Sequence, residues 1–184
     1  MKKSFSTSII FPLKSAIIKI DLLNWTFPAM IAGAITKGAG EMIRLRGHHI
    51  FCLIGYHGMG YSKEFVQNMT RIHQTLRKNP EIQVEIIEGP DPICEKYPNC
   101  GKYHCEDQNI YERDLAVIEK LGLSIGQVLQ WEEIEERIRK RVKPSDIHAL
   151  CQSCSWLSYG VCEEGIKELI EGKGLREIPE KTGI

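Results

Sequence analysis

Residues 151–162, with the sequence CQSCSWLSYGVC, carry three thiols in one short loop. Cys151 and Cys154 stand at the C-x-x-C spacing, which lets a single tight turn direct two sulfur atoms at one point. A group of thiolates on a turn is typical of sites for soft metals. A second loop, residues 93–105, holds three further thiols at Cys94, Cys100 and Cys105. We therefore expect the fold to bring these first (93–105) and second (151–162) cysteine loops together around one metal centre.

The composition is that of an ordinary soluble globular protein, with 42% hydrophobic and 26% charged residues. A chain of 184 residues is long enough for one domain with a substantial core. The formal net charge is zero, so we expect neither nucleic acid nor an anionic membrane surface as a partner. The chain has no run of about 18 apolar residues, and we therefore expect no transmembrane helix.

The seven cysteines indicate a cytoplasmic protein with reduced thiols, because a secreted disulfide protein generally has an even number and a signal peptide. The apolar stretch near the N-terminus is interrupted by Lys14, Lys19 and Asp21, unlike the continuous apolar region of a secretory signal. Residues 1–41 are basic and nearly free of acids. We expect them to be a poorly ordered extension, or the result of a start site assigned too early, with Met42 as the natural start.

From Met42 onward the hydrophobic periodicity predicts a helix-dominated α+β fold, with four to six helices and two or three short strands. Alternating residues indicate strands at 43–46 and 82–87. Helical spacing and capping residues indicate helices at 48–56, 63–78, 106–121, 131–142, 163–171, and from Pro144 or Ser145 to Leu150. We expect residues 42–171 to form one globular cysteine-rich domain and residues 172–184 to form a frayed tail.

Two further expectations concern single side chains. The apolar face of the helix at 106–121 should consist of Ile110, Leu115, Ile118 and Leu121. Four histidines stand alone and are expected to face solvent: His57, His73, His104 and His148. His104 is next to Cys105 and is a minor candidate to replace a thiolate as a metal ligand.

Four thiolates suit either a tetrahedral zinc ion or an iron–sulfur cluster. Structural zinc sites commonly use two closely spaced cysteine pairs, and this chain has only the pair at Cys151 and Cys154. Widely separated ligands with aromatic neighbours favour an iron–sulfur cluster, because aromatic side chains can shield it from solvent. The neighbouring aromatic residues are Tyr97, Tyr103, Trp156 and Tyr159. Zinc and the absence of any metal remain the alternatives at this point.

The segment HHIFC, which begins at His48, is a second group of reactive side chains. On a helix, His48 and His49 would lie four and three positions from Cys52 and share its face. A cysteine and a histidine could act as a nucleophile with its base, or belong to a second metal site. The simpler interpretation is two histidines hydrogen-bonded to acids at the top of a buried helix, with Cys52 as a small core residue. Arg44 and Arg46 could bind a carboxylate or phosphate, or pair with acids.

Four motifs in order resemble the domain of unknown function 1284 family: RLRGHHIFCL at 44–53, GMGYSKEFV at 58–66, GPDPIC at 89–94 and CQSCSW at 151–156. The similarity extends from about Met42 to Cys162. It implies a small prokaryotic protein of unestablished activity that binds an iron–sulfur cluster. The recurrent cysteines of the family match Cys94, Cys105, Cys151, Cys154 and Cys162. Some relatives have a cysteine where this chain has Tyr97, which leaves the second ligand of the first loop open between Cys100 and Cys105, with Cys105 favoured.

The main functional hypothesis is therefore a 4Fe–4S protein that transfers electrons, senses oxidants or uses the cluster to hold its fold. The expected ligands are Cys94, Cys105, Cys154 and Cys162, with Cys151 and Cys100 contested. The partner would be a redox protein or a small molecule. One alternative is a zinc-stapled structural or interaction module. Another is a metal-dependent enzyme using His48 and His49, with Arg46 and Cys52 as further catalytic candidates, which predicts a pocket lined by these residues and the loop from Gly58 to Tyr61.

Overall fold

The computed structural model describes residues 42–98 and 104–179. The predictions for the extension at 1–41, for Cys100 and Tyr103, for the side chain of His104 and for the last five residues of the tail lie outside the described residues. Within the described part, the chain has six α-helices and one three-stranded sheet, so the predicted helix-dominated α+β class is confirmed.

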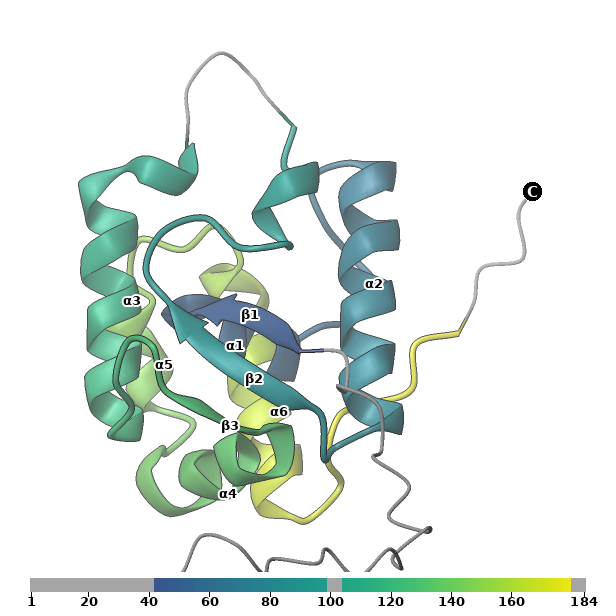
Figure 1. The fold of residues 1–184 in the computed structure, drawn as a ribbon, viewed down its shortest axis with the longest axis vertical. Helices are drawn as coiled ribbons and strands as arrows, with labels where there is room; N and C mark the ends of the chain where they lie inside the picture. The colour runs from purple at the N-terminus through teal and green to yellow at the C-terminus, as the bar shows by residue number, and fades with distance from the viewer. Residues whose placement is uncertain (1–41, 99–103, 180–184) are drawn as a thin grey trace, which may run out of the picture. The chain divides into compact units, whose positions relative to one another are not determined.

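The sheet has the order β1-β2-β3 (Figure 1). Strand β1 (Ile43–Arg46) runs parallel to β2 (Gln83–Ile87), with Leu45 opposite Ile86. Strand β3 (Val128–Gln130) is antiparallel to β2. The alternation of apolar residues predicted β1 and β2 from the sequence. In the structure, the apolar residues Leu45, Val84 and Ile86 of these strands are fully buried. In the three-residue β3 only Leu129 is buried, which is too short a pattern to predict a strand.

Six helices surround the sheet, and Figure 1 shows α2 on one side of it and α3 on the other. Their bounds are α1 Gly47–Ile54, α2 Lys63–Lys78, α3 Gln108–Leu121, α4 Trp131–Arg141, α5 Asp146–Leu150 and α6 Val161–Ile170. Ser62 caps α2 by accepting a hydrogen bond from the backbone N–H of Phe65. No helix in the described part of the chain is long and apolar enough to cross a membrane.

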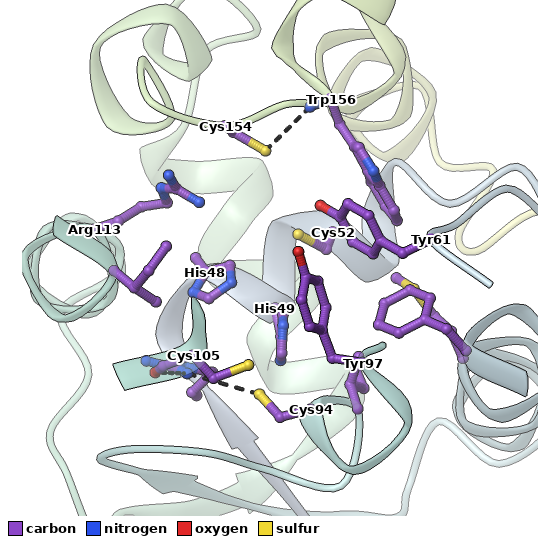
Figure 2. Close-up of a pocket in the computed structure, with 15 residues that line it drawn as sticks. His48, His49, Cys52, Tyr61, Cys94, Tyr97, Cys105, Arg113, Cys154 and Trp156 are labelled. Carbon is purple, nitrogen blue, oxygen red and sulfur yellow. Dashed lines mark hydrogen bonds between the residues drawn. The ribbon is translucent and has the colours of Figure 1, made fainter. Parts of the chain in front are cut away.

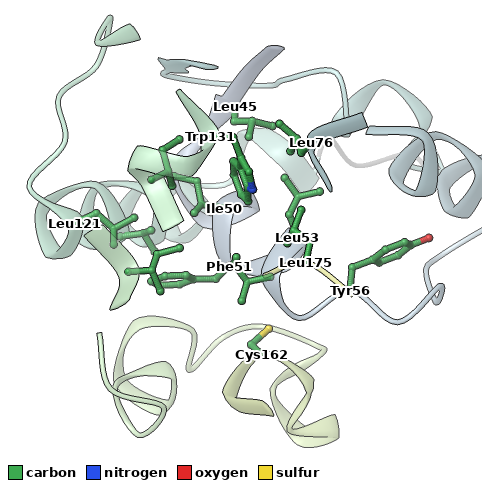
Figure 3. Packing of buried hydrophobic residues seen from close by; sticks show 14 of the residues in the cluster. Leu45, Ile50, Phe51, Leu53, Tyr56, Leu76, Leu121, Trp131, Cys162 and Leu175 are labelled. Carbon is green, nitrogen blue, oxygen red and sulfur yellow. The ribbon is translucent and has the colours of Figure 1, made fainter. Parts of the chain in front are cut away.

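Helix α1 is the central element of the core, and glycines let its neighbours approach it closely. Ile50, Phe51 and Leu53 have no exposed surface (Figure 3). A Cβ atom at Gly47 would lie 2.3 Å from the carbonyl oxygen of Asp114 in α3. A Cβ atom at Gly165 in α6 would lie 2.2 Å from the carbonyl oxygen of Ile54. The two contacts fix α1, with its histidines and Cys52, between α3 and α6.

Two expectations about single side chains are wrong. Leu115 in α3 is 52% exposed, and Val117 is buried in its place, so the apolar face of this helix is rotated from the expected one. His73 is fully buried against Tyr56, with ring centroids 5.4 Å apart. The first residues of the expected tail pack on the domain: Leu175 is 6% exposed and Arg176 donates a hydrogen bond to Glu168.

Candidate metal centre

Four thiols line one pocket between the two cysteine loops. Cys52 comes from α1, Cys94 and Cys105 come from the first loop, and Cys154 comes from the second. Figure 2 shows Cys94 and Cys105 together at one end, Cys154 at the other, and the rings of His48 and His49 between them. The cavity volume is about 40 Å³, room for about three water molecules, which suits an inorganic centre or a small ion better than a large organic substrate.

The pair at the first end is organised by Arg46. Its Nη1 donates to the carbonyl oxygen of Cys105 at 2.8 Å and to Sγ of Cys94 at 3.7 Å. The hydrogen bond with Cys105 and then burial raise the pKa of Cys94, whereas the hydrogen bond from Cys94 lowers the pKa of Cys105. Of the two thiols, Cys105 is therefore the one that loses its proton more readily, with Cys94 as the hydrogen-bond donor to it.

Each histidine is held by a buried carboxylate. Nδ1 of His48 lies 2.7 Å from Oδ1 of Asp114, and Nδ1 of His49 lies 2.7 Å from Oδ2 of Asp91. Because a carboxylate accepts, Nδ1 carries the proton, and in the neutral ring Nε2 keeps its lone pair. No described residue hydrogen-bonds to either Nε2, and both rings line the pocket. This is the arrangement by which proteins orient metal-binding or catalytic imidazoles.

The two histidines differ in charge preference although their ring centroids are only 4.3 Å apart. Burial, and next the charge of His49, lower the pKa of His48 to about 4. Burial also lowers the pKa of His49, but the charge and the hydrogen bond of Asp91 outweigh it and raise the pKa overall. His48 is therefore neutral at pH 7 and its Nε2 is available as a ligand.

An aromatic group closes one side of the pocket. Tyr61 stacks on Trp156, with centroids 5.8 Å apart, and contacts Tyr97 at 4.7 Å. Its hydroxyl group lies 3.0 Å from Oγ of Ser155 in the second cysteine loop. Tyr97 and Trp156 were expected beside the centre, whereas Tyr159 is 65% exposed and does not line the pocket. The expected pocket of His48, His49, Arg46 and the glycine loop is present, with Tyr61 as the contribution of that loop.

Two of the expected ligands do not reach the pocket. Cys162 is 6% exposed and belongs to the hydrophobic core (Figure 3), and Cys151 is 5% exposed. Burial raises the pKa of Cys151 to about 11 and that of Cys162 to about 12. Cys52 is the fourth thiol that lines the pocket, although the sequence favoured it as a core residue. Its pKa is raised by burial and then by the charges of Cys154, Cys162 and Cys151.

One compact group of possible ligands exists among the described residues. His49, Asp91 and Cys94 each bring one ligand atom within 4.8 Å of the others. No three thiols of the described part of the pocket form such a group, although Cys94 and Cys105 are hydrogen-bonded to each other. Sulfur ligands of one tetrahedral zinc ion lie about 3.8 Å apart, given bonds of about 2.3 Å. In a cluster each thiolate binds a different iron atom, and the sulfur atoms are therefore farther apart.

A family model described as "Protein of unknown function (DUF1284)" matches residues 60–160. The matched residues include three of the pocket thiols, Cys94, Cys105 and Cys154, and the aromatic residues from Tyr61 to Trp156. Helix α1 precedes the matched residues. No curated protein and no solved structure matches the chain.

Proposed function

The chain belongs to the DUF1284 family of proteins of unknown function, and we propose that it binds an iron–sulfur cluster in the pocket between its two cysteine loops. The ligands we assign are Cys94, Cys105, Cys154 and Cys52. The supporting observation is that segments far apart in the sequence contribute four thiols to one pocket. Cys52 replaces Cys162 in the set expected from the sequence, because Cys162 packs in the core.

The electrostatics of the pocket favour a negatively charged centre. Arg46 has no exposed surface and contacts Cys94 and the backbone of Cys105. Burial, together with neighbouring thiols, raises the pKa of Cys52, so a metal centre must displace its proton on binding. The thiol with the lowered pKa, Cys105, offers the first thiolate for metal capture.

Asp91 ties one ligand to the neighbouring histidine. Its Oδ1 accepts the backbone N–H groups of Ile93 at 2.9 Å and Cys94 at 3.3 Å, and its Oδ2 accepts Nδ1 of His49. The carboxylate thereby sets the position of Cys94 and of the His49 ring together. A cluster in this place would supply one-electron redox chemistry, and the aromatic group of Tyr61, Tyr97 and Trp156 would limit its contact with water.

A single zinc ion is the second candidate, supported by the compact group of His49, Asp91 and Cys94. Against it, both oxygens of Asp91 already accept hydrogen bonds, including one from the backbone N–H of Arg46 at 3.0 Å. A zinc ion on Asp91 would have to displace some of these bonds. This candidate predicts a colourless protein with about one zinc ion per chain.

The test is anaerobic purification of the full chain, followed by its visible spectrum and by iron, sulfide and zinc analysis of the same sample. We expect a brown protein with matching iron and sulfide, and loss of most of the colour in the Cys94→Ser, Cys105→Ser and Cys154→Ser variants. Cys151→Ser is the matched control, because this thiol is in the second loop but does not line the pocket. A colourless wild-type protein that contains zinc, or pocket variants that keep full iron content, would refute the proposal.

A further inference from the structure

The pocket contains a buried positive charge without a carboxylate partner. Arg113 in α3 is 7% exposed and lines the pocket. Its Nη2 donates to Oγ of Ser153 at 2.6 Å, and its buried Nε has no hydrogen-bond partner. Among the described residues, no carboxylate lies within ion-pair distance of this side chain. A buried guanidinium is costly unless it is paired, so the position calls for an anion.

The neighbouring arginine shows what a paired guanidinium looks like in this protein. Nε and Nη2 of Arg46 lie 2.8 and 2.7 Å from Oδ2 of Asp114. The other oxygen of Asp114 accepts the backbone N–H and Nδ1 of His48. Asp114 is adjacent to Arg113 in the sequence, but both of its oxygens are committed to Arg46 and His48. The charge of Arg113 is therefore left for a group that enters the pocket.

The rest of the lining is suited to a negative ligand. No aspartate or glutamate is among the described residues that line the pocket, whereas two arginines and two histidines are. Figure 2 shows Arg113 and His48 on the side of the pocket opposite the rings of Tyr61 and Tyr97. An anion bound to Arg113 would therefore lie between the polar side of the pocket, with Arg113 and His48, and the aromatic side.

We propose that Arg113 is the binding subsite for a small carboxylate, held beside the metal centre. Of the five N–H groups of a guanidinium, Arg113 donates only one to a described acceptor, and the remaining planar fork matches a carboxylate. Without a metal centre, the cavity volume of about 40 Å³ restricts the ligand to a few heavy atoms. That the carboxylate lies next to a cluster rests on the proposed function. Its binding at Arg113 can be measured with or without iron.

A competing role for Arg113 is to offset the charge of the thiolates, since its charge lowers the pKa of Cys151. The two roles differ in what they require. Charge compensation needs only a positive side chain at this position, and lysine would supply it. Carboxylate binding needs the planar fork of arginine, so Arg113→Lys separates the two.

The experiment measures thermal unfolding of the anaerobically purified full chain in sodium acetate and in sodium chloride at equal ionic strength. We expect acetate to raise the unfolding midpoint saturably, and Arg113→Gln to weaken acetate binding at least about tenfold. Arg113→Lys should keep the fold and still bind acetate several times more weakly than the wild type. Arg44→Gln is the control, because Arg44 is exposed on β1 outside the pocket, and it should bind acetate as the wild type does.

Equal effects of acetate and chloride on the wild type would overturn the inference, as would unchanged acetate binding in Arg113→Lys. Iron and sulfide are measured in the same samples. A wild-type protein that binds acetate without containing iron would refute the cluster and leave the carboxylate subsite standing. A wild-type protein that contains iron but does not respond to acetate would refute the subsite and leave the cluster standing.

Discussion

Replacing Asp114 with asparagine tests the buried network on which the pocket is built. Asp114 is 4% exposed and holds both the guanidinium of Arg46 and the ring of His48. Asparagine has nearly the same shape, but it removes the negative charge and leaves the fully buried Arg46 without its ion-pair partner. Breaking a buried pair in this way costs about 3–5 kcal/mol of unfolding free energy.

That cost is large for a domain of this size, whose total stability is of the order of 5–15 kcal/mol. It corresponds to a fall in the unfolding midpoint of roughly 10 °C, given about 2–4 °C per kcal/mol. Thermal and urea unfolding of the variant would measure it, with Glu119→Gln, an exposed acid on the same helix, expected to stay within about 0.5 kcal/mol of the wild type. A loss below about 1 kcal/mol in Asp114→Asn would show that Arg46 does not depend on this carboxylate.

Three further predictions concern other parts of the fold. Burial and the charges of Arg176 and Arg77 lower the pKa of His73 to about 4, so between pH 6.5 and 4 the unfolded state binds a proton that the folded state does not. The free energy of unfolding should therefore fall as pH decreases through this window. Urea titrations at pH 7 and pH 4.5 would measure the difference between the two values, which His73→Gln should reduce by about 2–3 kcal/mol. The same difference in the variant and the wild type would contradict the prediction. Gly165→Ala should cost about 1–3 kcal/mol, because its Cβ would collide with a carbonyl group of α1, and a variant as stable as the wild type would refute that packing. Tyr61→Ala should make the colour of the protein bleach faster in air, whereas Tyr159→Ala should not, and equal rates would show that the aromatic group does not shield the centre.

The periodic elements of this fold are readable from the sequence because they depend on local patterns. Helix α2 was predicted with its observed bounds, since Ser62 caps it and Phe65, Met69, Ile72 and Leu76 face the core. The buried face of α3 was not predicted correctly, because Leu115 and Val117 are both apolar. Only the packing of neighbouring elements decides which of the two is buried. The strand β3 depends on pairing with β2 rather than on a pattern of its own.

Part of the pocket lining was predictable for the same reason. The cysteines of the two loops are recognisable by spacing, and three of the four expected ligands line the pocket. The carboxylates that orient the histidines are 42 and 66 positions away, and no local pattern marks them. Tertiary packing likewise determines that Cys52 lines the pocket and that Cys162 does not. Because Gly55 has no side chain, α6 comes close to α1 and the thiol of Cys162 packs in the core. A Cβ atom at Gly55 would lie only 2.9 Å from Sγ of Cys162.

The proposed assignment of Cys52 rather than Cys162 as a ligand can be tested directly. The measurement is the iron and sulfide content per chain of Cys52→Ser and Cys162→Ser, each purified anaerobically from the full chain and checked for folding by thermal unfolding. We predict that Cys52→Ser loses most of its iron and sulfide, and that Cys162→Ser, although less stable, keeps the wild-type content. The reverse result, a full cluster in Cys52→Ser and none in folded Cys162→Ser, would contradict the assignment of the centre to this pocket.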